Sequence, residues 1–218
     1  MTRVALIHAL AHSVAPINAA FERAWPQCVR MNLLDDSLSA DLARSGGRLD
    51  GAMTARFLAL AAYAAGTGAQ GLLFTCSAFG PCIDAVACAH PGLAVLKPNE
   101  AMIAEAAALG RRIGLVATFA PTLASMPAEF PPGVDVVPML ADGALDALDH
   151  GNASAHDALV VAAARRAAAA GCDVVALAQF SMARAAAAVA TAVTVPVLTT
   201  PESAVRALAA RLGVRVGG

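Results

Sequence analysis

The chain has 218 residues, of which 58% are hydrophobic and only 14% are charged, and its formal net charge is −1. This length suits one large domain or two small ones. Because there is no basic cluster and Lys97 is the only lysine, we expect no nucleic-acid partner. The longest apolar stretches fall well short of the roughly 20 residues that a membrane span needs, so we expect no membrane association. Five cysteines, an odd number, are typical of reduced thiols and favour a cytoplasmic location.

Short β-type runs alternate with longer helical patterns along the whole chain. In chain order, the predicted strands are 4–7, 29–33, 71–74, 94–96, 113–117, 134–137, 174–177 and 195–198. The predicted helices lie near 14–25, 50–66, 79–89, 100–109, 154–170, 182–191 and 202–212. Continuous apolar strands that alternate with helices predict parallel sheets covered on both faces, and therefore an α/β fold.

An internal repeat divides this pattern into two similar halves. Residues 68–76 align with residues 171–179 at an offset of 103 (171 − 68), and a helix is predicted after each. The stretch R-I-G-L-V-A-T at 112–118 resembles R-V-A-L-I-H-A at 3–9. The repeat makes Cys76 and Gln179 equivalent positions.

The repeat also predicts how the chain divides into domains. We expect two pseudo-symmetric, doubly wound parallel-sheet lobes, the first built from residues 1–98 plus 200–218 and the second from residues 99–199. Open α/β sheets bind ligands at the carboxyl ends of their strands, so we expect the active site in the crevice between the lobes.

Cys76 is the first candidate for chemistry. It lies between Thr75 and Ser77, where a predicted strand ends and a helix should begin. Free amide N–H groups and the helix dipole at such a place lower the pKa of a thiol and bind anions such as carboxylates. A packed core cysteine is the alternative. We predict a functional role for Cys76 and core packing for the other four cysteines, Cys28, Cys82, Cys88 and Cys172.

Three stretches carry a resemblance to a known family. L-L-F-T-C-S-A-F-G (72–80), R-I-G-L-V-A-T (112–118) and D-V-V-A-L-A-Q-F-S (173–181) resemble the aspartate/glutamate racemase superfamily, which includes hydantoin racemases, maleate isomerases and arylmalonate decarboxylases. The resemblance implies two α/β lobes and no cofactor. It also implies that a cysteine from each lobe exchanges protons at the α-carbon of a small acid, and that Thr118 lies near the substrate carboxylate. Thr122 is displaced by one residue from the family's second threonine.

The second cysteine of that pair is missing, because position 179 holds glutamine. An amide neither takes nor gives a proton usefully near neutral pH, so ordinary two-thiol racemisation is not expected. Three mechanisms stay open. Cys76 could be the only base or nucleophile, with Gln179 holding a carboxylate or polarising a carbonyl. Cys76 could instead reprotonate an intermediate after decarboxylation, or a different second acid could act, for which His8 at the end of the first strand is the candidate.

The other candidate site residues carry hydroxyl groups near predicted strand ends. We predict that Thr75, Ser77, Thr118, Thr122 and Ser181 bind the substrate, together with His8. Helix capping is the alternative for Thr118, Thr122 and Ser181.

Several polar residues have a simpler interpretation. Asp35 and Asp36 favour a solvated turn, and no metal site is predicted. His156 is expected at the surface. Arg184 is either a surface charge or a contact to an anionic substrate.

The sequence thus predicts a cofactor-independent isomerase or racemase-like enzyme that acts next to the carboxylate of a small acid through Cys76. The alternatives are a decarboxylase or other lyase of a malonate-like acid, and a non-catalytic small-molecule binding protein of the same fold. The low charge content leaves room for a subunit interface, so we expect a homo-oligomer.

Overall fold

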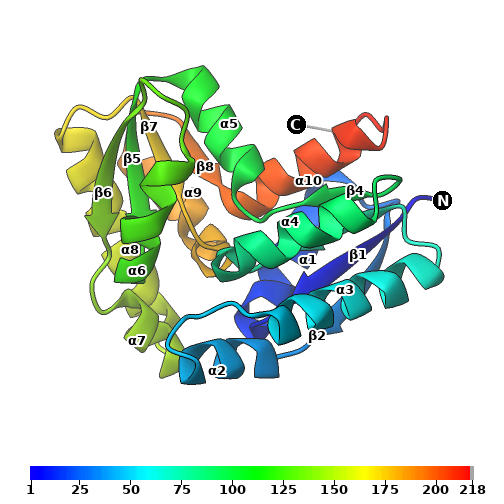
Figure 1. Cartoon of the computed structure of the whole chain (residues 1–218). Coiled ribbons are helices and arrows are strands. Elements are labelled where there is room, and N and C mark those ends of the chain that lie inside the picture. The colour runs from blue at the N-terminus through cyan, green and yellow to red at the C-terminus, as the bar shows by residue number, and fades with distance from the viewer. Residues whose placement is uncertain (217–218) are drawn as a thin grey trace. The chain divides into compact units, whose positions relative to one another are not determined.

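The computed structural model describes residues 1–216 and contains two parallel four-stranded sheets (Figure 1). Internal contacts divide the chain into two compact units. The first lobe comprises residues 1–98 and the segment from residue 204 onward, and the second lobe comprises residues 99–203. The predicted α/β class is confirmed.

The strands of the first lobe are β1 (Arg3–His8), β2 (Val29–Leu34), β3 (Gly71–Phe74) and β4 (Ala94–Leu96), and those of the second are β5 (Arg112–Ala117), β6 (Asp135–Leu140), β7 (Val174–Leu177) and β8 (Val197–Thr199). The helices are α1 (Val14–Ala24), α2 (Ser37–Arg44), α3 (Gly51–Gly66), α4 (Gly80–Ala89), α5 (Glu100–Leu109), α6 (Ala120–Ser125), α7 (Ala144–Asp149), α8 (Ala153–Ala169), α9 (Ala186–Ala192) and α10 (Thr200–Arg211). Within the described residues, every predicted strand and helix is found; β3, β4, β7 and α5 have the predicted bounds, and the ends of the others are shifted. The short helices α2, α6 and α7 were not predicted.

The two sheets share one topology. Their strand orders are β2-β1-β3-β4 and β6-β5-β7-β8, and all pairs are parallel. The central strands also end alike: the Thr75 N–H donates to the Ile7 carbonyl at 3.0 Å, and the Ala178 N–H donates to the Val116 carbonyl at 2.9 Å. The internal repeat is therefore confirmed as a repeat of topology.

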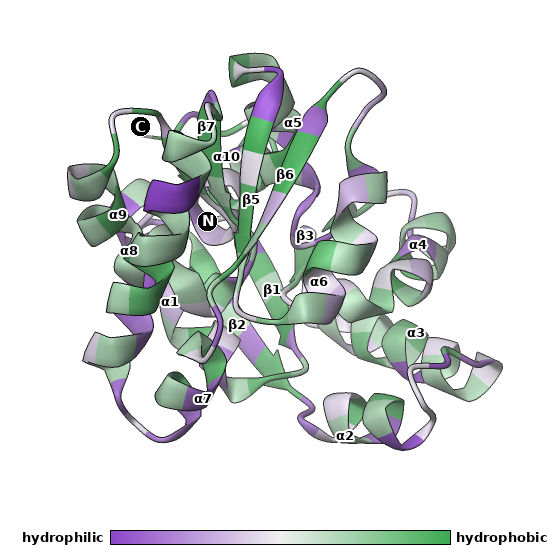
Figure 2. Ribbon diagram, turned by 90° about the vertical axis from the view of Figure 1, so that its left-hand side faces the viewer, coloured by the Kyte–Doolittle hydropathy of each residue, from purple (hydrophilic) through white to green (hydrophobic). Residues whose placement is uncertain are grey.

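The cores explain why the strands read as continuous apolar runs. β3 and β7 are buried along their whole lengths, and β1 and β5 are buried after an exposed first arginine. Figure 2 colours most of β5 as hydrophobic. In the first lobe, Phe57 of α3 stacks on Phe74 of β3 with ring centroids 5.4 Å apart.

Alanine and glycine let α8 approach the second sheet closely. A Cβ atom added to Gly114 in β5 would lie 2.5 Å from the Cβ of Ala167 in α8 and 3.3 Å from the Cys172 sulfur. The helix is thus held at a distance that only glycine allows at this position.

Two predictions about the burial of single residues are wrong. Cys28, Cys82 and Cys172 are buried as predicted, but Cys88 is exposed because the last turn of α4 presents it to solvent. His156 is fully buried, since it lies on the inner face of α8 one turn before the buried Val160. Among the described residues, no helix is both long and apolar enough to cross a membrane.

Candidate active site

Cys76 and Gln179 lie at the same place in their respective lobes. Each follows the central strand β3 or β7 by two residues and immediately precedes a 3₁₀ helix, Ser77–Phe79 or Phe180–Ala185. Their backbones are both extended, with φ −131° and ψ 119° at Cys76 and φ −131° and ψ 145° at Gln179. The structure thus supports the equivalence that the repeat predicts.

The Cys76 thiol is partly exposed and is weakly acidic. Burial raises its pKa above the ordinary thiol value, and a hydrogen bond from the backbone N–H of Ala78 offsets this only in part. The expectation of a lowered pKa is wrong for this structure. The reason is burial, which disfavours the charged thiolate more than the single hydrogen bond from Ala78 stabilises it.

The thiol lies against a small recess in the first lobe. The recess encloses about 170 Å³ of empty space, part of it open to solvent, but its interior is too narrow for a water molecule. Its lining is largely apolar and comprises Ile7, His8, Ala9, Leu38, Phe57, Phe74, Cys76 and Phe79. In this conformation the recess is too small to hold a substrate group, although the Cys76 thiol itself is partly exposed.

His8 connects three strands beneath this recess. It is fully buried, its Nδ1 lies 2.9 Å from the Thr75 hydroxyl, and its Nε2 lies 3.0 Å from Asn32 Oδ1. Burial lowers the pKa of His8, although the Asn32 hydrogen bond acts in the opposite direction. Since Asn32 presents its oxygen, Nε2 carries the proton and Nδ1 accepts from Thr75. His8 is therefore a neutral residue with both ring nitrogens engaged, and a role for His8 or Thr75 in binding substrate stays a prediction.

Gln179 is held by Thr118 of the neighbouring strand end. Its Oε1 accepts from the Thr118 N–H at 2.6 Å and from the Thr118 hydroxyl at 2.9 Å. A backbone N–H can only donate, so the amide oxygen must face Thr118. The Gln179 NH₂ group then points away from Thr118, as a fixed hydrogen-bond donor. Thr118 uses both of its donors on Gln179.

The side-chain hydroxyls of the other predicted residues form no hydrogen bond within the part of the chain that the structure describes. Ser77 is exposed, and Thr122 and Ser181 are partly exposed. Helix capping does not explain the threonines, because Phe119 is the N-cap of α6 and no side chain caps that helix. Substrate binding by Ser77, Thr122 and Ser181 stays a prediction.

Arg184 belongs to a separate polar cluster in the second lobe. Its Nε and Nη2 donate to the two carboxylate oxygens of Asp157 at 2.8 and 3.3 Å, and His156 Nδ1 lies 2.8 Å from Asp157 Oδ1. The pair links the 3₁₀ helix after Gln179 to α8. Arg184 thus has a partner within its own lobe.

Two residues near Cys76 were not singled out from the sequence. Leu38 lies on the unpredicted helix α2, and Phe57 lies on α3, where its spacing indicates only a core position. Of the two residues predicted in a solvated turn, Asp36 is exposed in a turn, whereas Asp35 is only partly exposed and forms an ion pair with Arg56. Contacts between such distant segments leave no short motif that could have revealed them.

Two lobes of one topology, each with a polar residue at the end of its central strand, define a duplicated α/β protein. Solved structures with this architecture include an aspartate racemase from Picrophilus torridus, with a TM-score of 0.74 and 10% identity over 100% of this chain and 96% of that chain. The chain is also similar to unliganded arylmalonate decarboxylase, with a TM-score of 0.70 and 19% identity over 100% of this chain and 94% of that chain. Allantoin racemase from Klebsiella pneumoniae gives a TM-score of 0.68 and 19% identity over 100% and 91%.

No model of a protein family matches the sequence, and no curated protein matches it. The structural likeness nevertheless extends over the whole chain. The protein has the fold of the aspartate/glutamate racemase superfamily, as its sequence motifs suggest.

Proposed function

We propose that the protein catalyses cofactor-independent proton transfer or isomerisation at the carbon next to the carboxylate of a small acid, with Cys76 as the proton-transfer group. The observation that carries this proposal is the pairing of residues at equivalent strand ends: a partly exposed thiol in the first lobe and an oriented amide in the second.

Gln179 is suited to hold negative charge. With its oxygen fixed by Thr118, its NH₂ group can donate to a substrate carboxylate or to the oxygen of an enolate-like intermediate. Because Gln179 cannot exchange a proton itself and both ring nitrogens of His8 are engaged, we assign proton transfer at carbon to Cys76. Isomerisation needs only one such group if the proton leaves and returns on the same face of the substrate.

The raised pKa of Cys76 favours a second candidate function, the decarboxylation of a malonate-like acid. A thiol that is protonated at rest is a proton donor first. In this reaction the carbon–carboxylate bond breaks, CO₂ leaves, and the bonding electron pair enters an enediolate. The Cys76 S–H then gives its proton to carbon, and water reprotonates the thiolate.

The test is to incubate the protein with a panel of small 2-substituted acids and malonates in D₂O. Proton NMR would follow the loss of the α-proton signal, and CO₂ release would be recorded in parallel. We expect turnover of at least one acid, and a loss of about 10²- to 10⁴-fold in Cys76→Ala, which is the usual contribution of a general acid or base. Exchange without CO₂ indicates proton transfer or isomerisation, and CO₂ release with one deuterium incorporated indicates decarboxylation.

Cys88→Ala is the matched control, because Cys88 is an exposed cysteine on α4 of the same lobe. It should turn over the substrate at the rate of the unmodified protein. Undiminished turnover by Cys76→Ala would refute the role of Cys76. Acids that bind without any exchange or CO₂ release would favour the non-catalytic binding protein.

A further inference from the structure

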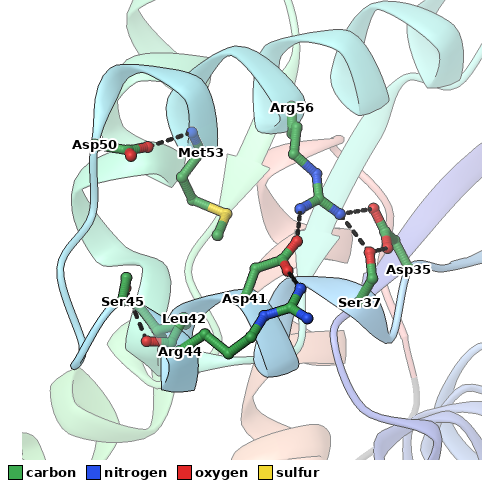
Figure 3. A network of polar contacts seen from close by, with 9 residues as sticks. All are labelled: Asp35, Ser37, Asp41, Leu42, Arg44, Ser45, Asp50, Met53 and Arg56. Atoms are coloured by element: carbon green, nitrogen blue, oxygen red, sulfur yellow. Dashed lines mark hydrogen bonds and ion pairs between the residues drawn. The ribbon is translucent and has the colours of Figure 1, made fainter.

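Arg56 lies at the centre of a polar cluster in the first lobe that plays no part in the mechanism above. Its Nη1 donates to Asp41 at 2.5 Å, and its Nη2 donates to Asp35 at 2.7 Å and to the Ser37 hydroxyl at 2.6 Å. The Ser37 hydroxyl in turn donates to Asp35 at 2.6 Å. Figure 3 shows the Arg56 guanidinium reaching from α3 to both carboxylates.

The partners of Arg56 all belong to one short segment. Asp35 and Ser37 lie where α2 begins, and Asp41 lies within the same helix. At its other end, α2 is followed by Gly46 and Gly47, both with positive φ. Arg56 therefore ties a short helix to the much longer α3 at two points.

The tethered helix covers the strand end that carries the recess. The Ser39 hydroxyl donates to the Ala9 carbonyl at 2.8 Å, directly after β1. Leu38 is the only buried residue of α2, and its side chain forms one wall of the recess beside Cys76. Phe57, next to Arg56 on α3, forms another wall.

We infer that Arg56 is a positioning residue: by holding Asp35, Ser37 and Asp41, it keeps α2 over the end of β1, so that Leu38 closes the recess and limits access to the Cys76 thiol. The recess is too narrow for water in this state, so a substrate group can occupy it only after one of its walls has moved, and we assign that movement to α2. The link to turnover rests on the proposed function, whereas the control of access to the thiol does not.

Arg44 provides a matched control within the same cluster. It forms an ion pair with Asp41 three residues earlier on α2, so this pair lies within the helix and ties it to nothing else. Both arginines thus contact Asp41, but only Arg56 connects α2 to α3.

The experiment measures the iodoacetamide labelling rate of each cysteine in the folded protein by mass spectrometry of its peptides. The variants are Arg56→Gln, Arg56→Lys and Arg44→Gln. In Arg56→Gln we expect Cys76 to label roughly five- to tenfold faster, the effect of losing a pair of partly exposed ion pairs. Arg44→Gln should stay near the original rate. Arg56→Lys should fall between them, because lysine cannot bridge both carboxylates with a planar fork.

Cys28 and Cys82 distinguish local release of α2 from general unfolding, since both are buried in the same lobe. Their labelling should not change in Arg56→Gln. Asp35→Asn weakens the contact between α2 and Arg56 from the α2 side. It should raise the labelling rate of Cys76 selectively, but by less than Arg56→Gln does. The inference is overturned if Cys76 labels at the original rate in Arg56→Gln, or if Cys28 and Cys82 accelerate together with Cys76 in both variants.

This readout is independent of turnover. A selective rise at Cys76 in a protein that turns over no acid would support the tether and refute the proposed function. Turnover that depends on Cys76, combined with unchanged labelling of Cys76 in Arg56→Gln, would support the proposed function and refute the role of Arg56.

Discussion

The ends of β3 and β7 have the same backbone conformation and the same place in their sheets, yet their chemical environments are opposite. In the first lobe, Cys76 receives one backbone hydrogen bond and lies against an apolar recess, and burial raises the pKa of its thiol. In the second, Gln179 receives two hydrogen bonds from Thr118. The two strand ends thus share a backbone conformation but carry side chains of different chemistry, a thiol and an amide.

A neighbouring position explains much of this difference. Thr118 and Ala9 are equivalent in the repeat, since each follows the last residue of the first strand of its lobe. Ala9 has no hydroxyl to give to Cys76, so the first lobe lacks the second donor that the other lobe has. An anion at position 179 would be stabilised by Thr118, whereas a thiolate at position 76 has no such neighbour.

Among the variants considered, Gln179→Cys should have the largest effect on the difference between the two strand ends, because it places a thiol at both. The Thr118 N–H and hydroxyl would then face a sulfur atom and lower the pKa of the new thiol. We expect iodoacetamide at pH 7 to label it about tenfold faster than Cys76, as hydrogen bonding to a thiolate implies. A second acid–base group should also raise α-proton exchange in D₂O by about 10²-fold.

Gln179→Ser is the control for this variant, because serine matches cysteine in shape but does not exchange a proton near neutral pH. If the new thiol in Gln179→Cys labelled no faster than Cys76, the claim that Thr118 makes the second strand end favourable for anions would fail.

The packing of the lobes should differ at a second equivalent pair. Ala5 in β1 corresponds to Gly114 in β5, and Ala5 is buried without difficulty. Gly114→Ala would force its Cβ against Ala167, 2.5 Å away. We expect a loss of about 1–3 kcal/mol in the free energy of unfolding, typical of overpacking, measured by urea denaturation.

Gly66→Ala is the matched control, since no atom lies within 4 Å of a Cβ added there and Gly66 is the last residue of α3. It should leave the free energy of unfolding unchanged or slightly raised. Equal stability of Gly114→Ala and the original protein would mean that α8 can move away from β5.

The pH dependence of Cys76 labelling tests the environment of the strand end in the first lobe. Because burial raises its pKa in the folded state, labelling should be several-fold slower near neutral pH than in urea-unfolded protein, and its midpoint should lie at higher pH. The stabilisation that comes from the neutral buried thiol is complete below the pKa of the unfolded chain. It is lost as the pH rises through the folded-state pKa.

Cys76→Ala should accordingly reduce the loss of stability on the alkaline side, measured by urea denaturation between neutral and alkaline pH. A labelling midpoint in the folded protein below that of the unfolded chain would contradict the raised pKa, and with it the preference for a thiol that donates first.

Much of this arrangement could be predicted from the sequence, because it depends on local patterns. Buried apolar runs gave the strands, and the offset of 103 residues paired Cys76 with Gln179. The direction of the pKa shift of Cys76 could not be predicted, since it depends on burial by residues that are distant in the sequence, such as Leu38 and Phe57. The contacts that hold α2 to Arg56 could not be predicted either, because Asp35 and Arg56 are 21 residues apart and α2 has a single buried residue.

The contact between Thr118 and Gln179 could be predicted only in part. The sequence places both at strand ends, but it does not show that Thr118 gives both of its donors to Gln179 rather than to a substrate. That contact joins residues 61 positions apart and depends on which way an amide turns.

The smallest expected effect tests this contact. Thr118→Val removes the hydroxyl donor at nearly constant volume and leaves the backbone N–H in place. We expect a loss of about 1 kcal/mol in the free energy of unfolding, the usual net contribution of one hydrogen bond, measured by urea denaturation. Thr118→Ser keeps the hydroxyl and should lose less. If turnover of an identified acid falls about fivefold in Thr118→Val and recovers in Thr118→Ser, the orientation of Gln179 contributes to function as well as to stability. If Thr118→Val and Thr118→Ser are equally destabilising, the Thr118 hydroxyl does not hold Gln179. The Thr118 backbone N–H alone then orients the amide, which has no counterpart at the equivalent strand end of the first lobe.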